Sequence, residues 1–305
     1  MKKKDSTLDL GDYIVDLTTM SGVNKVANRQ NGSYIAIRKK DKKKFVIKAS
    51  FDYVSNPLKE KITNRLKMVR GKVISGHLPL VDYRWGASNE LMLIFELLDK
   101  QSSLKSHIAQ TGVPICEIYS TKEIVGFLVS IADGLLQYKK NFSAVHNELQ
   151  MRRLITYHVP GNQEQTFITL NFPNRLLVTG DMYYDFTTDD IEYLSINALL
   201  GYKAKNLAER EKECVWSFGI LMYELFAGER PYTLPEAEVR AAKAGKADYS
   251  KPKKLALLIK DKKFDWSSAK NPVIAKIVKN ILALDPAHRL TIPQLQNLMV
   301  GYYNQ

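Results

Sequence analysis

The sequence has very little cysteine and no long hydrophobic run. Only Cys116 and Cys214 are cysteines among its 305 residues, and they lie far apart in the chain. Two such cysteines support neither a disulfide framework nor a zinc site, and they favour a reducing setting. No apolar run approaches the roughly eighteen residues that a transmembrane helix needs. The basic N-terminal segment also lacks the apolar region of a signal peptide. We therefore expect a cytoplasmic protein with no transmembrane segment in this chain.

Acidic residues are also in deficit. The chain has 45 Lys and Arg against 32 Asp and Glu, which gives a formal net charge of +13. Much of the basic excess lies in four blocks, at residues 2–4, 38–44, 251–254 and 260–263. Such blocks can bind nucleic acid or anionic lipid, although solvated basic turns are the simpler interpretation. No aromatic residues interleave with them as a single-strand binding platform requires.

One stretch, residues 213–232, predicts a helix that is buried on every side. From Trp216 to Phe226 almost no polar face remains over three turns. Gly228 then offers a C-terminal stop, and Pro231 prevents the helix from continuing. A helix of this kind needs several amphipathic elements packed around it.

The hydrophobic pattern changes along the chain from mostly strand to mostly helix. Strands are expected at residues 13–17, 33–38, 44–49, 80–83 and 91–97, with a basic helix at residues 57–73. After Asp99 a capping box at Ser120 and Glu123 opens a helix that runs through Tyr138. Further helices are expected at residues 273–284 and from Pro293 onward. These patterns predict a β-rich lobe at residues 1–98 and a helical lobe at residues 99–305.

Four strings, in this order, resemble motifs of the protein kinase domain. Residues 45–48 are similar to V-A-I-K, and residues 144–155 to the catalytic-loop pattern V-H-R-D-L-A-A-R-N-V-L. Residues 215–232 resemble the central helix of the kinase C-lobe in its tyrosine-kinase-like version, and residues 284–289 resemble D-P-x-x-R. The resemblance implies an α+β bilobal fold. It has a five-stranded antiparallel N-lobe with one helix and a mainly helical C-lobe.

The resemblance assigns nucleotide-binding roles in the first lobe. Lys48 matches the lysine that binds ATP phosphates. Phe95, Glu96 and Leu98 match the hinge, with Phe95 as a bulky gatekeeper that narrows the adenine pocket. The glycine-rich loop is degenerate, because the candidate run keeps only Gly22, and without glycines the backbone cannot approach phosphates closely.

The acidic and metal-binding positions of the family are altered. The glutamate that pairs with the strand lysine falls near residues 65–68, and Glu60 lies too early, so we infer that this partner is lost. Glu148 stands at the position of the catalytic aspartate, and Arg153 at that of the metal-binding asparagine. The D-F-G aspartate aligns either with Gly180 or with Asp181, and we favour Asp181 because Met182 then fills the apolar position.

Two structural positions of the family are altered as well. Residues 195–197 stand where A-P-E is expected, and the glutamate of that motif pairs with the arginine that matches Arg289. We therefore expect Arg289 to lack its usual partner. Cys214 replaces an aspartate that hydrogen-bonds the catalytic-loop backbone in the family.

These changes together predict a pseudokinase that acts as a scaffold or allosteric protein-interaction module in signalling. We expect no competent catalytic residue, no metal site and no required cofactor. Weak ATP binding without magnesium, through Lys48, Arg153 and Asp181, stays an open alternative. So do an atypical low-activity kinase that uses Glu148 and Asp181, and a basic module that binds nucleic acid or anionic lipid. The chain is expected to have protein partners, and an origin as the intracellular part of a larger receptor is the alternative to a free cytoplasmic protein.

Overall fold

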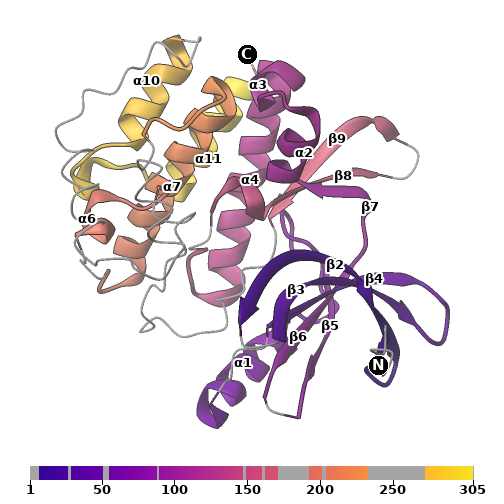
Figure 1. Cartoon of the computed structure of the whole chain (residues 1–305). Coiled ribbons are helices and arrows are strands. Elements are labelled where there is room, and N and C mark those ends of the chain that lie inside the picture. The colour runs from indigo at the N-terminus through magenta and orange to yellow at the C-terminus, as the bar shows by residue number, and fades with distance from the viewer. Residues whose placement is uncertain are drawn as a thin grey trace. The chain divides into compact units, whose positions relative to one another are not determined.

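The computed structural model describes residues 7–26, 29–50, 55–87, 89–146, 149–159, 162–170, 192–200, 204–232 and 272–304. The chain forms two compact units. The first unit includes Met1–Gln101 and Tyr157–Thr166, and the second unit includes Ser102–Thr156 and Tyr183–Gln305 (Figure 1). The change of unit after Gln101 lies close to residue 98, where the sequence pattern changes from strand to helix.

A six-stranded antiparallel sheet forms the first unit. Its strand order is β1-β2-β3-β4-β6-β5. The strands are β1 (Thr7–Asp9), β2 (Tyr13–Val26), β3 (Arg29–Arg38), β4 (Lys44–Ser50), β5 (Leu80–Trp85) and β6 (Leu91–Glu96). The sequence predicted five strands and missed β1, because a strand of 3 residues is too short to show an alternating pattern.

This sheet is curled, and its inner face carries an apolar cluster. Tyr13 and Val15 of β2 and Ile47 of β4 belong to one cluster of buried residues. Arg84 on β5 places its Nη2 atom 2.9 Å from Oδ2 of Asp12, next to β2, although β3, β4 and β6 lie between these strands in the sheet order. The accumulated twist of the strands therefore brings the two ends of the sheet together.

Helix α1 (Asn56–Val69) lies beside the sheet in the first unit (Figure 1). Its buried residues, Ile62, Leu66 and Val69, recur at helical spacing. The predicted helix continued to residue 73, but α1 ends at Val69. Arg70 leaves the helical conformation, and Gly71 adopts a φ of 70° that a continuing helix cannot contain.

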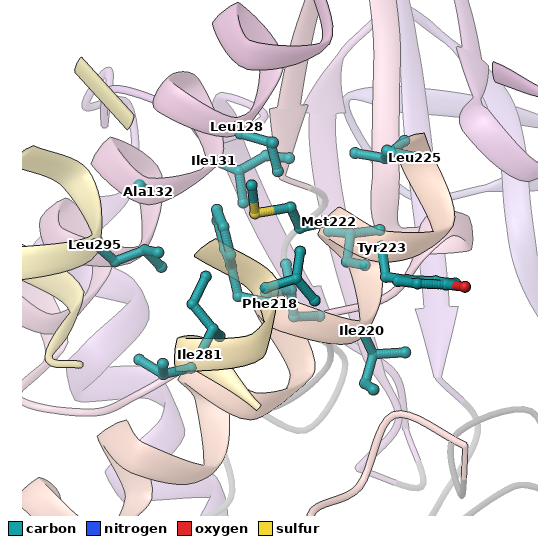
Figure 2. Packing of buried hydrophobic residues seen from close by; sticks show 14 of the residues in the cluster. Leu128, Ile131, Ala132, Phe218, Ile220, Met222, Tyr223, Leu225, Ile281 and Leu295 are labelled. Carbon is teal, nitrogen blue, oxygen red and sulfur yellow. The ribbon is translucent and has the colours of Figure 1, made fainter. Parts of the chain in front are cut away.

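Helix α7 (Leu207–Ala227) is the centre of the second unit. Side chains of other helices pack against its Phe218 and Met222 in Figure 2, among them Leu128, Ile131, Ile281 and Leu295. Gly219 is required on this helix, because a Cβ atom there would lie 2.6 Å from Cγ2 of Ile281. The helix ends as predicted, with Gly228 in the left-handed conformation at φ 78°. It begins at Leu207, six residues before the predicted stretch, where the side chain of Asn206 caps it.

The remaining elements complete the described part of the chain. The helices are α2 (Leu104–Thr111), α3 (Ile115–Ile118), α4 (Thr121–Phe142), η1 (Met151–Arg153), α6 (Ile196–Leu199), α10 (Pro272–Ile281), η3 (Pro286–His288) and α11 (Ile292–Tyr303). Strands β7 (Asp99–Ser103), β8 (Leu154–Val159) and β9 (Asn162–Leu170) form a second sheet in the order β7-β8-β9. The capping box predicted at Ser120 is present at the start of α4. None of the described helices is both long enough and apolar enough to cross a bilayer.

Candidate functional site

The sheet of the first unit brings Lys48 and Phe95 onto one face. Lys48 of β4 is paired with Leu93 of β6, and Val46 is paired with Phe95. Because alternate residues of a strand point to the same side, these four side chains share a face. Lys48 is only 8% exposed and Phe95 only 1% exposed. The lysine and the bulky gatekeeper that the sequence assigned to a nucleotide pocket are therefore neighbours within the sheet.

The structure also describes the other residues that the sequence assigned to the first lobe. Glu96 ends β6 and is exposed, and its N–H donates to the carbonyl of Pro79 at 3.2 Å. Leu98 is half-buried, and its N–H donates to the side chain of Gln101 at 2.9 Å. Glu60 is exposed on α1. Among the described residues no ion pair joins Glu60 to Lys48, and the loss of the family's glutamate stays a prediction.

The catalytic-loop segment of the second unit is anchored by buried apolar residues. His146 is buried and meets the ring of Tyr138 edge-on at 5.4 Å. Leu149 and Leu154 are buried on either side of η1. Arg153 ends η1, where its N–H donates to the carbonyl of Gln150 at 2.8 Å. These buried side chains fix the register of the catalytic-loop segment.

Three of the predicted site residues fall outside the described residues. Glu148 belongs to the catalytic-loop segment, and Gly180 and Asp181 are the two candidates for the D-F-G aspartate. Their roles stay predictions from the resemblance. Within the described ranges, no group of three His, Cys, Asp or Glu side chains is arranged to hold a metal ion.

A buried polar cluster that the sequence did not predict lies beside the catalytic-loop segment. The N–H of Met151 donates to the hydroxyl of Tyr193 at 3.5 Å, and that hydroxyl donates to the carboxylate of Glu224. Arg230 pairs with the buried Glu192 and approaches Glu224 at 3.5 Å. Burial raises the pKa of Glu224 to about 7, against the opposing hydrogen bond from Tyr193. The only sequence signal for this cluster is the Glu-Tyr pair just before residues 195–197.

Arg289 was expected to lack its usual partner, and the structure pairs it with a different carboxylate. The family's glutamate is absent, but Glu213 takes its place, with 3.2 Å between its Oε1 atom and Nη1 of Arg289. Ser195 donates a hydrogen bond to the same carboxylate. The guanidinium also donates to three backbone carbonyls and stacks over the ring of Trp216 at 4.8 Å. Sequence comparison missed this pair because Glu213 comes from α7 rather than from the segment at residues 195–197.

Cys214 is an inert structural residue. Its side chain is 3% exposed, and burial strongly raises the pKa of the thiol, so that it stays protonated at neutral pH. A thiol is only a weak hydrogen-bond acceptor, whereas the aspartate of the family is a strong one. We therefore expect the contact that ties α7 to the catalytic loop in the family to be weaker at this position.

Comparison with protein families agrees with this arrangement. The family model described as protein tyrosine and serine/threonine kinase matches residues 23–299. A comparison with curated proteins finds no match. The family match spans well over half of the chain and includes Lys48, Arg153, the whole of α7 and Arg289. The chain therefore belongs to the family of protein tyrosine and serine/threonine kinases.

Proposed function

We propose that this kinase-family domain is a pseudokinase, which works as a scaffold or allosteric partner in protein interactions rather than by phosphoryl transfer. The observation that carries the proposal is Arg153 at the position of the metal-binding asparagine. Magnesium in phosphoryl transfer requires oxygen ligands. A guanidinium has only N–H donors and a positive charge, so this position does not fit the magnesium ion that the family uses.

The local structure argues against rescue by a simple shift of register. Met151 and Leu154 are buried on either side of Arg153, and the 3₁₀ turn between them is closed by a backbone hydrogen bond. Moving a neighbouring residue into the metal position would expose one of these anchors. We therefore infer that the arginine remains at the metal position in any conformation that keeps the turn.

Further changes act in the same direction. Glu148 is one methylene longer than the catalytic aspartate, and the candidate glycine-rich loop has a single glycine. A displacement near 1 Å can cost roughly a hundredfold in rate where catalysis depends on positioning. By contrast, the buried helix α7 and the replacement partner of Arg289 stabilise the fold. A stable kinase fold with altered catalytic positions is what a binding module needs, and such a module requires no cofactor.

Phosphoryl transfer by the purified chain tests the proposal directly. With magnesium and ATP we expect no incorporation of phosphate into the chain or into a peptide above the level of a Lys48→Ala control. Incorporation that the Lys48→Ala variant abolishes would contradict the proposal and favour the atypical active kinase.

Substitution of Arg153 tests the physical reason. If the guanidinium repels magnesium, Arg153→Asn should make the ATP-induced rise in melting temperature larger with magnesium than without it. Arg152→Asn is the matched control, because it removes the same charge one residue earlier. Thermal denaturation with millimolar ATP measures both, since a ligand that binds only the folded state raises its stability. If Arg153→Asn and Arg152→Asn change the ATP-induced rise in melting temperature equally, the guanidinium of Arg153 is not the cause of weak magnesium binding.

A further inference from the structure

The first unit contains a cavity of about 510 Å³ on the curled sheet, away from the face that carries Lys48. We call it the basic cavity. It lies where the two ends of the sheet come together, and its polar lining includes Asp12, Asp82 and five basic side chains, those of Arg38, Lys39, Lys40, Arg70 and Arg84. Its volume is within the range of roughly 300–1,000 Å³ that small-molecule sites occupy.

A buried carboxylate orients two of the guanidinium groups. The side chain of Asp82 is only 5% exposed, with its Oδ1 atom 2.9 Å from Nε of Arg70 and its Oδ2 atom 2.6 Å from Nη1 of Arg84. Both arginines are ion-paired with this one carboxylate, whose Oδ1 atom accepts no hydrogen bond in the described part of the chain, and the pairing favours guanidinium positions that line the cavity. Asp82 thus acts as a positioning residue of the basic cavity.

Several hydrogen-bond donors in the lining of the basic cavity remain available to an anion. Asp82 engages Arg70 through Nε, which leaves both terminal nitrogens of a half-exposed guanidinium without an acceptor among the described residues. Lys40 is exposed and has no ion pair in the described part of the chain. Asp12 pairs with Arg84 but is 74% exposed, and such exposed ion pairs contribute little. An incoming anion can replace the carboxylate of Asp12 on Arg84.

The other two basic residues raise the positive potential but are already paired. Lys39 contacts Asp9 at 2.9 Å, and Arg38 contacts Asp41. Asp9 and Asp41 do not line the cavity. An anion with one charge would satisfy only part of this set, whereas a phosphate monoester has up to two charges and three terminal oxygens for guanidinium forks.

We propose that the basic cavity binds phosphoryl groups of a compact phosphorylated ligand. A concave site of this volume favours a ligand of the size of an inositol phosphate over an extended nucleic acid. The phosphoryl groups can belong to a free metabolite or to a lipid headgroup. The site is independent of the proposed pseudokinase function, because its residues are separate from Lys48 and Arg153.

Titration of the full chain with inositol hexakisphosphate by calorimetry tests the site. The site variant combines Lys40→Ala with Arg70→Gln. The matched control combines Lys43→Ala with Lys67→Gln, which removes two charges from exposed positions outside the lining. We expect the site variant to weaken binding by about tenfold or more and the control by less than about twofold, since charge-assisted hydrogen bonds are lost only in the first. If the double site variant does not fold, Lys40→Ala alone replaces it, because Lys40 lies in an exposed turn.

Vesicles distinguish the two sources of phosphoryl groups. Binding to phosphatidylcholine vesicles that contain phosphatidylinositol bisphosphate, lost in the site variant and competed by the free inositol phosphate, would identify a lipid headgroup. Binding of the free compound alone would identify a soluble ligand. Equal weakening by both double variants, preference for an oligonucleotide, or no binding to either probe would overturn the proposal.

Discussion

Removing the charge of Glu213 on α7 should destabilise the second unit. The substitution Glu213→Gln keeps the size of the side chain but leaves the guanidinium of Arg289, which has 0% side-chain exposure, with backbone carbonyls as its main acceptors. Breaking a buried ion pair from one side costs about 3–5 kcal/mol. Because the side chain of Glu213 is 21% exposed, we expect the lower end, about 3 kcal/mol.

Thermal and urea unfolding of the full chain, followed by circular dichroism, measures this loss. At about 2–4 °C per kcal/mol for a domain of this size, the melting temperature should fall by about 6–12 °C. Glu229→Gln is the matched control, because Glu229 is exposed just after α7 and should change the free energy of unfolding by less than about 0.5 kcal/mol.

A double-mutant cycle separates the ion pair from other effects of the substitution. In an Arg289→Met background the buried charge is gone, and Glu213→Gln should then cost less than about 1 kcal/mol. The same cost in both backgrounds would show that the loss does not arise from the pair. A cost below about 1 kcal/mol in the wild-type background would show that the carbonyls alone stabilise the guanidinium.

Two further predictions concern the second unit. The pKa of Glu224 rises from 4.5 in the unfolded chain to about 7 in the folded one, so its contribution is fully present below about pH 4.5 and is lost as the pH rises to about 7. At the upper limit this contribution to the free energy of unfolding is about 3 kcal/mol. Glu224→Gln should therefore flatten the dependence of melting temperature on pH between 5 and 8. Parallel pH profiles of the wild type and the variant would contradict the assigned pKa. Gly219→Ala should lower the free energy of unfolding by about 1–3 kcal/mol, because the added Cβ atom would lie 2.7 Å from Cδ2 of Leu282 and 2.6 Å from Cγ2 of Ile281 in α10. Gly301→Ala in α11 is the control, because its Cβ atom meets nothing within 4 Å. It should raise the free energy of unfolding by about 0.5–1 kcal/mol. Equal effects at the two glycines in urea unfolding would refute the packing argument.

Local patterns predicted the elements whose cause is local. The apolar run and Gly228 gave the body and end of α7, and the capping box gave the start of α4. The first turns of α7 were missed because they depend on distant partners. Glu211 is buried there, pairs with Lys139 at 2.7 Å and accepts the N–H of Ile292 at 2.9 Å. A charged residue with its partners 72 and 81 positions away has no pattern that a sequence window can detect.

The same distinction separates the predicted part of the candidate site from the rest. Lys48 and Arg153 were assigned to the site because each lies within a short string of fixed spacing. The partner of Arg289 was not, because the family supplies a carboxylate from residues 195–197 and this chain supplies one from α7. A buried guanidinium needs a negative partner, and loss of the first glutamate alone would leave a cost of about 3–5 kcal/mol, a large part of the stability of a typical domain. Glu213 offsets that cost without restoring anything that phosphoryl transfer uses. The pair therefore supports the proposal that this domain depends on its fold and not on its chemistry.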